Sequence, residues 1–158
     1  MESTGESAET ILRFWFGTAV DDLKVAEERG KLWWKKNPRI DGEIRERFAG
    51  VLGNAVQGQY DDWLVEACGR LALIILADQF SRNIYRGTPQ AFTHDPLALF
   101  WSKDGIASGL DQQLRPIERV FFYMPFEHSE AIEDQHQSVA LFEALATGVV
   151  PEKRKLFN

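Results

Sequence analysis

The sequence predicts an all-α fold, a single-domain array of roughly seven or eight helices joined by short loops. Apolar residues recur at helical spacing along most of the 158 residues, and no stretch alternates apolar and polar residues over the length of a strand. Hydrophobic residues make up 44% of the chain and aromatic residues 12%, which argues against a disordered protein. We therefore expect one helical domain over residues 7–146, with flexible termini at residues 1–6 and 147–158.

Boundary signals delimit the first two helices. A helix over residues 7–16 is expected to end at Gly17, because glycine readily adopts the left-handed backbone that closes a helix. A second helix is capped by Asp21 or Asp22 and runs through the pair Trp33-Trp34. Adjacent residues of a helix cannot both face inward, so we expect the second tryptophan of this pair to be exposed.

The next two helices also have clear starts. The pair Asn37-Pro38 combines a side-chain cap with a proline at the first helical position, and apolar residues then repeat at helical spacing as far as Gln57. The acidic pair Asp61-Asp62 supplies a cap for a shorter helix through Cys68. We expect the following helix to begin after Gly69.

The stretch Leu71–Arg86 contains no Gly or Pro, and its first half is apolar on both sides of a helix, as in a buried helix. Its apolar part is far shorter than the ~20 residues of a membrane span, so we expect burial within the protein. One side becomes polar at Asp78 and Arg82, an acid four residues before a base, which is the favourable order for a helical ion pair. This pair either fixes how the helix packs or forms, with Asn83 and Arg86, the floor of a polar pocket.

Cap-plus-proline signals recur in the C-terminal half of the chain. The pair Asp95-Pro96 opens a helix that extends to Ala107 and is expected to hold Phe100 inside. The pair Arg115-Pro116 opens a shorter helix. We expect Pro125 to end that helix, because the proline ring collides with the preceding turn and removes a backbone donor.

The last long helix is expected over residues 130–146, with Ser129 as its cap. It begins with polar side chains on the face that later becomes apolar, with Gln135 on that face and Asp134 at its edge. His128 lies just before it. If the start of this helix meets the end of the central stretch, these side chains form one polar cluster, and two of its carboxyl groups could act as an acid/base pair.

Composition excludes several function classes. The formal net charge is −6 and no basic run precedes residues 153–155, so we expect no nucleic-acid partner. Cys68 is the only cysteine, which leaves no intrachain disulfide and no cysteine zinc site. The histidines lack metal-binding spacing and no glycine-rich nucleotide loop occurs, so we expect no metal and no cofactor. The N-terminus MESTGESAET is unlike a signal peptide, which indicates a soluble cytoplasmic protein without a membrane partner.

Three segments carry a family resemblance: RFWFG (13–17), LALIILADQFSRNIYRGTPQAFTHD (71–95) and FFYMPFEHSEAIEDQ (121–135). They resemble the bacterial family catalogued as domain of unknown function 924, over about residues 11–146. The resemblance implies a tetratricopeptide-like helical superhelix and no known activity. It places the family's signature polar residues at Asp78, Gln79, Arg82, Asn83, Arg86, His94, Asp95, His128, Ser129, Glu130 and Gln135.

The chain departs from the family pattern at its C-terminal end. Members of the family usually continue into a further helix with a second polar motif, and residues 147–158 contain nothing like it. A missing helix would leave an apolar face exposed, which favours self-association. We therefore expect a homo-oligomer.

Three functions fit these features. The first is a binding module with an Arg- and His-lined pocket for the anionic group of a small molecule or peptide. The second is a hydrolase that uses an Asp/Glu–His–Arg cluster. In the third, the polar residues only hold the helices in register and function lies elsewhere. The candidate ligand-binding residues are Asp78, Arg82, Asn83, Arg86, His94, Glu127, His128, Glu130, Asp134 and Gln135.

Overall fold

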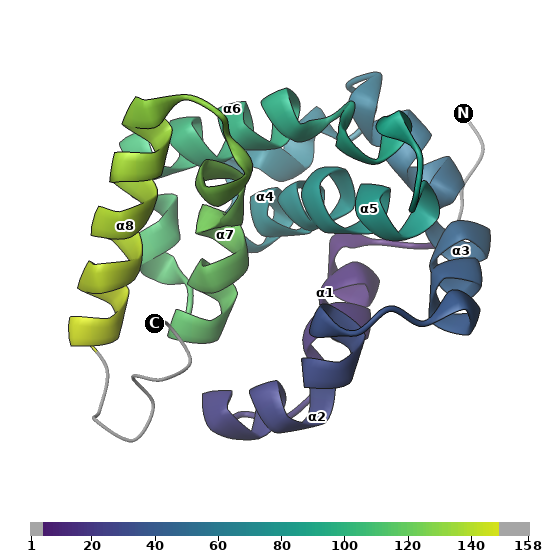
Figure 1. Ribbon diagram of the computed structural model, residues 1–158, viewed down its shortest axis with the longest axis horizontal. Coiled ribbons are helices and arrows are strands. Elements are labelled where there is room, and N and C mark those ends of the chain that lie inside the picture. Colours follow the sequence, from purple (N-terminus) through teal and green to yellow (C-terminus); the bar gives the residue numbers. More distant parts are fainter. Residues whose placement is uncertain (1–4, 149–158) are drawn as a thin grey trace.

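A computed structural model describes residues 5–148 of the chain. All regular secondary structure in this range is helical, and no strand occurs in it (Figure 1). The prediction of an all-α fold is therefore confirmed. None of the helices in the described range is both long and apolar enough to cross a lipid bilayer. The termini that we expected to be flexible lie mostly outside the described residues, which leave out residues 1–4 and 149–158. The α-helices are α1 (Ala8–Phe16), α2 (Asp22–Trp34), α3 (Pro38–Val56), α4 (Ala67–Ile74), α5 (Ser81–Ile84), α6 (Asp95–Ala107), α7 (Pro116–His128) and α8 (Ile132–Thr147).

A central rod organises the molecule. It consists of α4, the π-helix η2 (Ile75–Phe80) and α5, which follow one another without a loop. Helices α1, α6 and α7 pack against α4, α3 packs against η2 and α5, and α8 packs on α7 (Figure 1). The apolar residues Leu71–Ala77 are almost completely buried, which confirms that this stretch is a buried helix.

Large aromatic rings join the surrounding helices to the rod. The Trp15 ring of α1 meets Phe80 edge-on at 5.6 Å and Phe121 of α7 at 5.4 Å between centroids. The indole N–H of Trp33 donates to the backbone carbonyl of Trp15 at 2.9 Å, which ties α2 to α1. Trp34 is 64% exposed while Trp33 is buried, as the sequence predicts.

The expected caps begin the first three α-helices. Ser7 forms a reciprocal capping box with Thr10 at the start of α1, and Gly17 closes that helix with a φ of 71°. The Asp21 side chain accepts the backbone N–H of Lys24 in the first turn of α2, and the Asn37 side chain accepts those of Arg39 and Ile40 in α3. These boundaries confirm the sequence-based assignment.

The region before the rod differs from expectation. Asp61 and Asp62 do not cap a helix through Cys68; they belong to a 3₁₀ helix, η1 (Asp61–Val65), and α4 then begins without a side-chain cap. Helix α4 also continues through Gly69. A Cβ atom at Gly69 would lie 2.3 Å from the Trp63 carbonyl oxygen, so this glycine allows η1 to pack closely against α4 rather than ending a helix.

The rod itself is not one regular α-helix. At η2 the backbone N–H of Ser81 bonds to the Leu76 carbonyl, five residues back, where an α-helix would bond four back. This wider turn rotates the residues after Phe80 relative to a continuous α-helix. Asp78 lies within the π segment.

Two boundary predictions in the C-terminal half are wrong. Pro125 lies inside α7 instead of ending it, and the hydroxyl of Ser102 donates to the Phe122 carbonyl at 2.6 Å, which supplies a donor next to the disturbed turn. Asp95 is the first residue of α6, but its side chain does not cap that helix. Phe100, expected inside, is 61% exposed.

The start of α8 also differs. It begins at Ile132, two residues later than expected, and Ala131 is the N-cap residue. The Ser129 hydroxyl accepts a hydrogen bond from the Ala131 N–H at 3.2 Å, so it orders the turn before the helix instead of capping the helix itself.

Candidate functional site

Asp78 is the centre of a polar cluster inside the rod. Its side chain is fully buried. The carboxylate accepts hydrogen bonds from the Gln79 amide at 2.8 Å and from Nη1 of Arg82 at 3.4 Å, and it meets Nδ1 of His128 at 2.8 Å. Three polar partners offset the desolvation of this buried charge.

His128 brings α7 to this carboxylate. It is the last residue of α7, and its side chain is 24% exposed. A carboxylate only accepts hydrogen bonds, so in its contact with Asp78 the Nδ1–H of His128 is the donor. This arrangement fixes the ring and leaves Nε2 as the atom that can meet a ligand.

Arg82 joins Asp78 to the start of α6. Its Nη1 donates to the Asp78 backbone carbonyl at 2.6 Å, and its Nη1 and Nη2 pair end-on with the Asp95 carboxylate at 2.8 and 2.9 Å. Its guanidinium carbon lies 5.2 Å from the centre of the Phe92 ring. Nε of Arg82 donates to none of the residues described by the structure, and Nη2 makes only one bond within that range.

Asn83 and Arg86 belong to a different cluster, centred on Asp41 of α3. Nε and Nη2 of Arg86 pair side-on with the Asp41 carboxylate at 2.7 and 3.1 Å, and the Asn83 amide donates to it at 2.9 Å. Burial alone would raise the pKa of Asp41, but the bonds from Arg86 and Asn83 outweigh it and lower this pKa. The sequence analysis did not identify Asp41, although this acid lies at helical spacing with the buried residues Ile44 and Phe48.

Asp134 and Gln135 order the turn between α7 and α8. The Asp134 carboxylate receives Nζ of Lys103 at 2.7 Å and the Ser129 hydroxyl at 2.6 Å, and these two bonds, that of Lys103 first, lower the pKa of Asp134. The Gln135 amide donates to the backbone carbonyls of Glu127 and Ser129 at 2.9 and 2.5 Å. Both side chains thus act on the chain that holds His128, not on Asp78 itself.

The remaining candidates stand apart from Asp78. Glu127 and Glu130 are exposed on either side of His128. His94 is half-buried at the start of α6, one residue before Asp95. Within residues 5–148 no group of three or more His, Cys, Asp or Glu side chains is placed to hold a metal ion.

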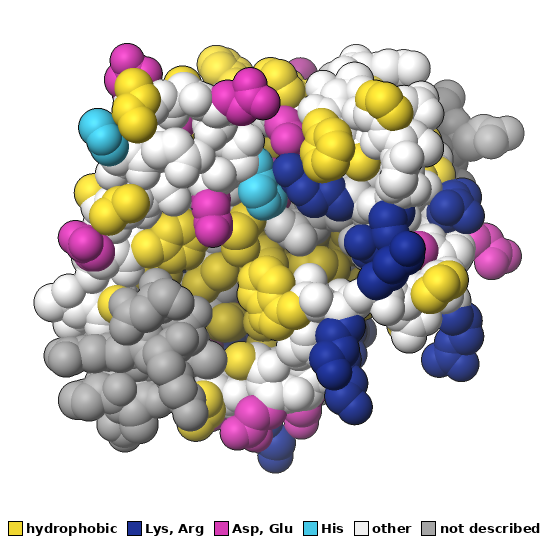
Figure 2. Space-filling model, viewed as in Figure 1, with side chains coloured by type: hydrophobic (Ala, Val, Ile, Leu, Met, Phe, Trp, Pro, Cys, Tyr) yellow, Lys and Arg dark blue, Asp and Glu magenta, His cyan; other side chains and the backbone are white. Residues whose placement is uncertain are grey.

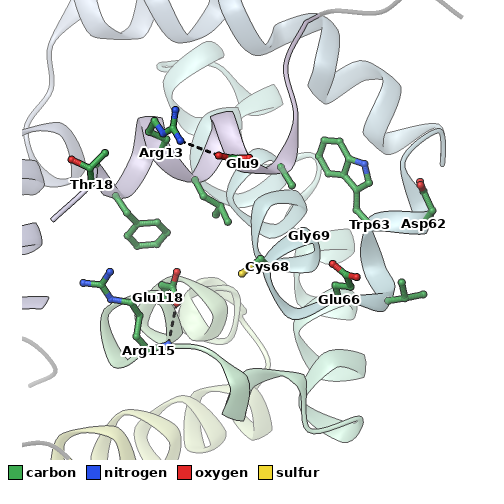
Figure 3. Close-up of a pocket in the computed structure, with 15 residues that line it drawn as sticks. Glu9, Arg13, Thr18, Asp62, Trp63, Glu66, Cys68, Gly69, Arg115 and Glu118 are labelled. Carbon is green, nitrogen blue, oxygen red and sulfur yellow. Dashed lines mark hydrogen bonds and ion pairs between the residues drawn. The ribbon is translucent and has the colours of Figure 1, made fainter. Parts of the chain in front are cut away.

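A cavity lies elsewhere, between α1, η1, α4 and α7 (Figure 3). It has a volume of about 730 Å³, and none of the candidate site residues predicted from the sequence lines it. Figure 3 shows Cys68 of α4 and Glu118 of α7 pointing into the space between these helices. No motif marks this cavity in the sequence, because its walls come from four separate segments.

Comparisons with known proteins agree with the fold. Residues 11–157 match the family described as "Bacterial protein of unknown function (DUF924)". A solved structure, described as a protein of unknown function, ATU0120, from Agrobacterium tumefaciens, is 36% identical in sequence, with a TM-score of 0.76 over 87% of this chain and 73% of that chain. A comparison with curated proteins found no match. The chain therefore belongs to the DUF924 family of bacterial proteins of unknown function.

Proposed function

We propose that the protein is a binding module that takes the anionic group of a small molecule or peptide at Arg82 and His128. The observation that carries this proposal is the incomplete use of the Arg82 guanidinium. Asp95 occupies its end-on fork, whereas Nε and one Nη2 hydrogen, which together form the side-on fork, have no partner among the described residues. A carboxylate or phosphate fits such a fork with two parallel hydrogen bonds.

The surroundings of Arg82 support an anionic ligand with an apolar body. On the face shown in Figure 2, Lys and Arg side chains gather over α3 and α5, whereas hydrophobic side chains gather in a hollow beside α7. Arg82 and His128 both contact the same oxygen of Asp78, so they lie next to one another. Arg86 uses its side-on fork on Asp41 and has no described contact with Asp78 or His128, so it stands apart from this pair.

A hydrolase is the second candidate, and the contact between Asp78 and His128 favours it. A buried carboxylate that orients a histidine through Nδ1 leaves Nε2 able to act as a general base. Ser129, the nearest hydroxyl in sequence, donates to Asp134 and is therefore not available as the partner of this base.

The experiment measures the rise in Tm on addition of anions in the wild type and in the variants Arg82→Lys and His128→Asn, which are chosen to remove ligand contacts while keeping the contacts of the fold. Lysine keeps the positive charge beside Asp95 but has no side-on fork, and asparagine keeps a donor for Asp78 but has no counterpart of Nε2. The exposed pair of α1 supplies a control, Arg13→Lys. The probes are inorganic phosphate and linear carboxylates from acetate to octanoate, at constant ionic strength.

A ligand at about 100 times its Kd stabilises a protein by about 2.7 kcal/mol. For a chain of this length that corresponds to a rise in Tm of roughly 5–10 °C. We expect this rise in the wild type and in Arg13→Lys, and less than half of it in Arg82→Lys and His128→Asn. The proposal is wrong if no anion raises the Tm of the wild type, or if both site variants respond as the wild type does.

A further inference from the structure

The cavity between α1, η1, α4 and α7 differs in charge from the site at Arg82. Its volume of about 730 Å³ lies within the range of small-molecule sites, ~300–1,000 Å³. One wall is apolar and includes Leu12 and Phe16 of α1 and Trp63 of η1. A ligand with a hydrocarbon or aromatic body can therefore bury its apolar surface here.

The two arginines of the cavity are already neutralised. Arg13 pairs with Glu9 at 2.9 Å on the same helix. Arg115 donates through Nε to Asp22 at 2.6 Å and also donates to the backbone carbonyls of Ala19 and Val20. Each guanidinium thus has a carboxylate partner beside it, which weakens its attraction for an anion in the cavity.

Two of the carboxylates that line the cavity, Glu66 and Glu118, differ from Glu9, which pairs with Arg13. Glu118 accepts a hydrogen bond from the backbone N–H of Arg115 at 3.0 Å, and neither Glu118 nor Glu66 forms an ion pair with a residue in the described part of the chain. Burial raises the pKa of the Glu118 carboxyl. The same two carboxylates affect the Cys68 thiol, whose pKa is raised first by burial and then by the negative charges of Glu118 and Glu66. The cavity is therefore negative where it is also apolar.

We propose that this cavity binds an organic cation, an ammonium group on an aromatic or aliphatic body, with the ammonium beside Glu118 and the body against Phe16 and Trp63. An ammonium would give Glu118 an ion-pair partner of its own, since Arg115, the cation near it, is paired with Asp22. The site is separate from the one proposed for anions, so either can exist without the other.

Three probes with the same ring test the role of charge: phenethylammonium, phenethyl alcohol and phenylacetate. We expect calorimetric titration to show binding of phenethylammonium at least tenfold tighter than binding of the other two. Glu118→Gln, which keeps an oxygen to accept the Arg115 N–H, should weaken that binding about tenfold, the size of one lost charge contact of ~1.4 kcal/mol. Glu66→Gln provides a second test if the first variant unfolds, and the exposed Glu133→Gln of α8 is the matched control.

Cys68 locates the bound probe, because it is the only cysteine of the chain and faces the cavity (Figure 3). Alkylation of the full-length protein with N-ethylmaleimide fills the space beside Glu118, so the modified protein should lose the binding of phenethylammonium. The inference fails if the alcohol or phenylacetate binds as tightly, if no probe binds, or if alkylated protein binds phenethylammonium unchanged.

Discussion

Replacing Arg82 with alanine tests whether the Asp78 cluster holds the fold together. The variant removes a hydrogen bond to the buried Asp78 carboxylate, one to its backbone carbonyl, and the two-bond contact with Asp95. Asp78 keeps Gln79 and His128 as partners. The buried Asp78 carboxylate therefore loses one of its three side-chain partners and keeps the other two.

The expected loss of stability in Arg82→Ala follows from these contacts. Removing one partner of a buried ion pair costs about 3–5 kcal/mol. Asp78 retains two partners and the Arg82 side chain is 23% exposed, so we expect the lower end of the range, about 3 kcal/mol. For a chain of this length, a loss of about 3 kcal/mol lowers Tm by roughly 6–12 °C.

The assay is urea unfolding followed by circular dichroism, with thermal unfolding beside it. Arg13→Ala is a matched control, since Arg13 and Glu9 form the same four-residue spacing on an exposed surface, and its cost should stay below about 0.5 kcal/mol. If Arg82→Ala costs no more than this control, the cluster does not stabilise the fold and our account of its energetics is refuted.

Two further variants test packing and pH dependence. Gly69→Ala places a Cβ 2.3 Å from the Trp63 carbonyl oxygen and should lower the unfolding free energy by about 2 kcal/mol or more, whereas Gly53→Ala, with no atom within 4 Å, should be neutral or stabilise by up to about 1 kcal/mol in urea titrations. The pKa of Asp134 is lowered chiefly by Lys103, so its contribution is present above the unfolded-state pKa and lost as pH falls through the folded one. In Lys103→Met the free energy of unfolding should therefore fall less steeply below about pH 4 than in the wild type. If it falls equally steeply in both proteins, Lys103 is not the cause.

The sequence predicts this fold well wherever a boundary depends on residues a few positions apart. Ser7, Asp21 and Asn37 cap their helices through N–H groups two or three residues ahead, so the signal and its effect lie in the same segment. The burial of Leu71–Ala77 follows from hydrophobicity on both sides of one helix. Neither inference needs knowledge of distant contacts.

The wrong boundaries arise where a distant contact overrides a local rule. Pro125 is accommodated inside α7 beside the Ser102 hydroxyl of α6, and Asp95 turns from its own helix to pair with Arg82. Gly69 reads locally as a helix stop, but the close approach of η1 explains it. Such contacts join segments that no periodicity connects, so sequence reasoning had no access to them.

The candidate site shows the same division. The sequence selects Asp78 because it follows an apolar pattern on one side of a helix, and His128 because it lies just before the polar start of the last long helix, and the structure brings the two into contact. It does not reveal that Arg86 turns to Asp41, because the two lie 45 positions apart. An acid on the apolar face of a predicted helix, as Asp41 is, marks a buried ion pair whose partner must be sought on another helix.

The neighbours of the unused donors distinguish the two clusters. Around Asp41, Asn83 and Arg86 direct their donors at a single carboxylate, as expected of a contact that fixes α3 against α5. Around Asp78, the same chemistry leaves Nε of Arg82 without a described partner and holds His128, whose side chain is 24% exposed, by one nitrogen. At Arg82 the unused donors lie beside a histidine that a fully buried acid orients, whereas Arg86 has no such neighbour among its described contacts, and this difference is the reason to search for a ligand at Arg82 first.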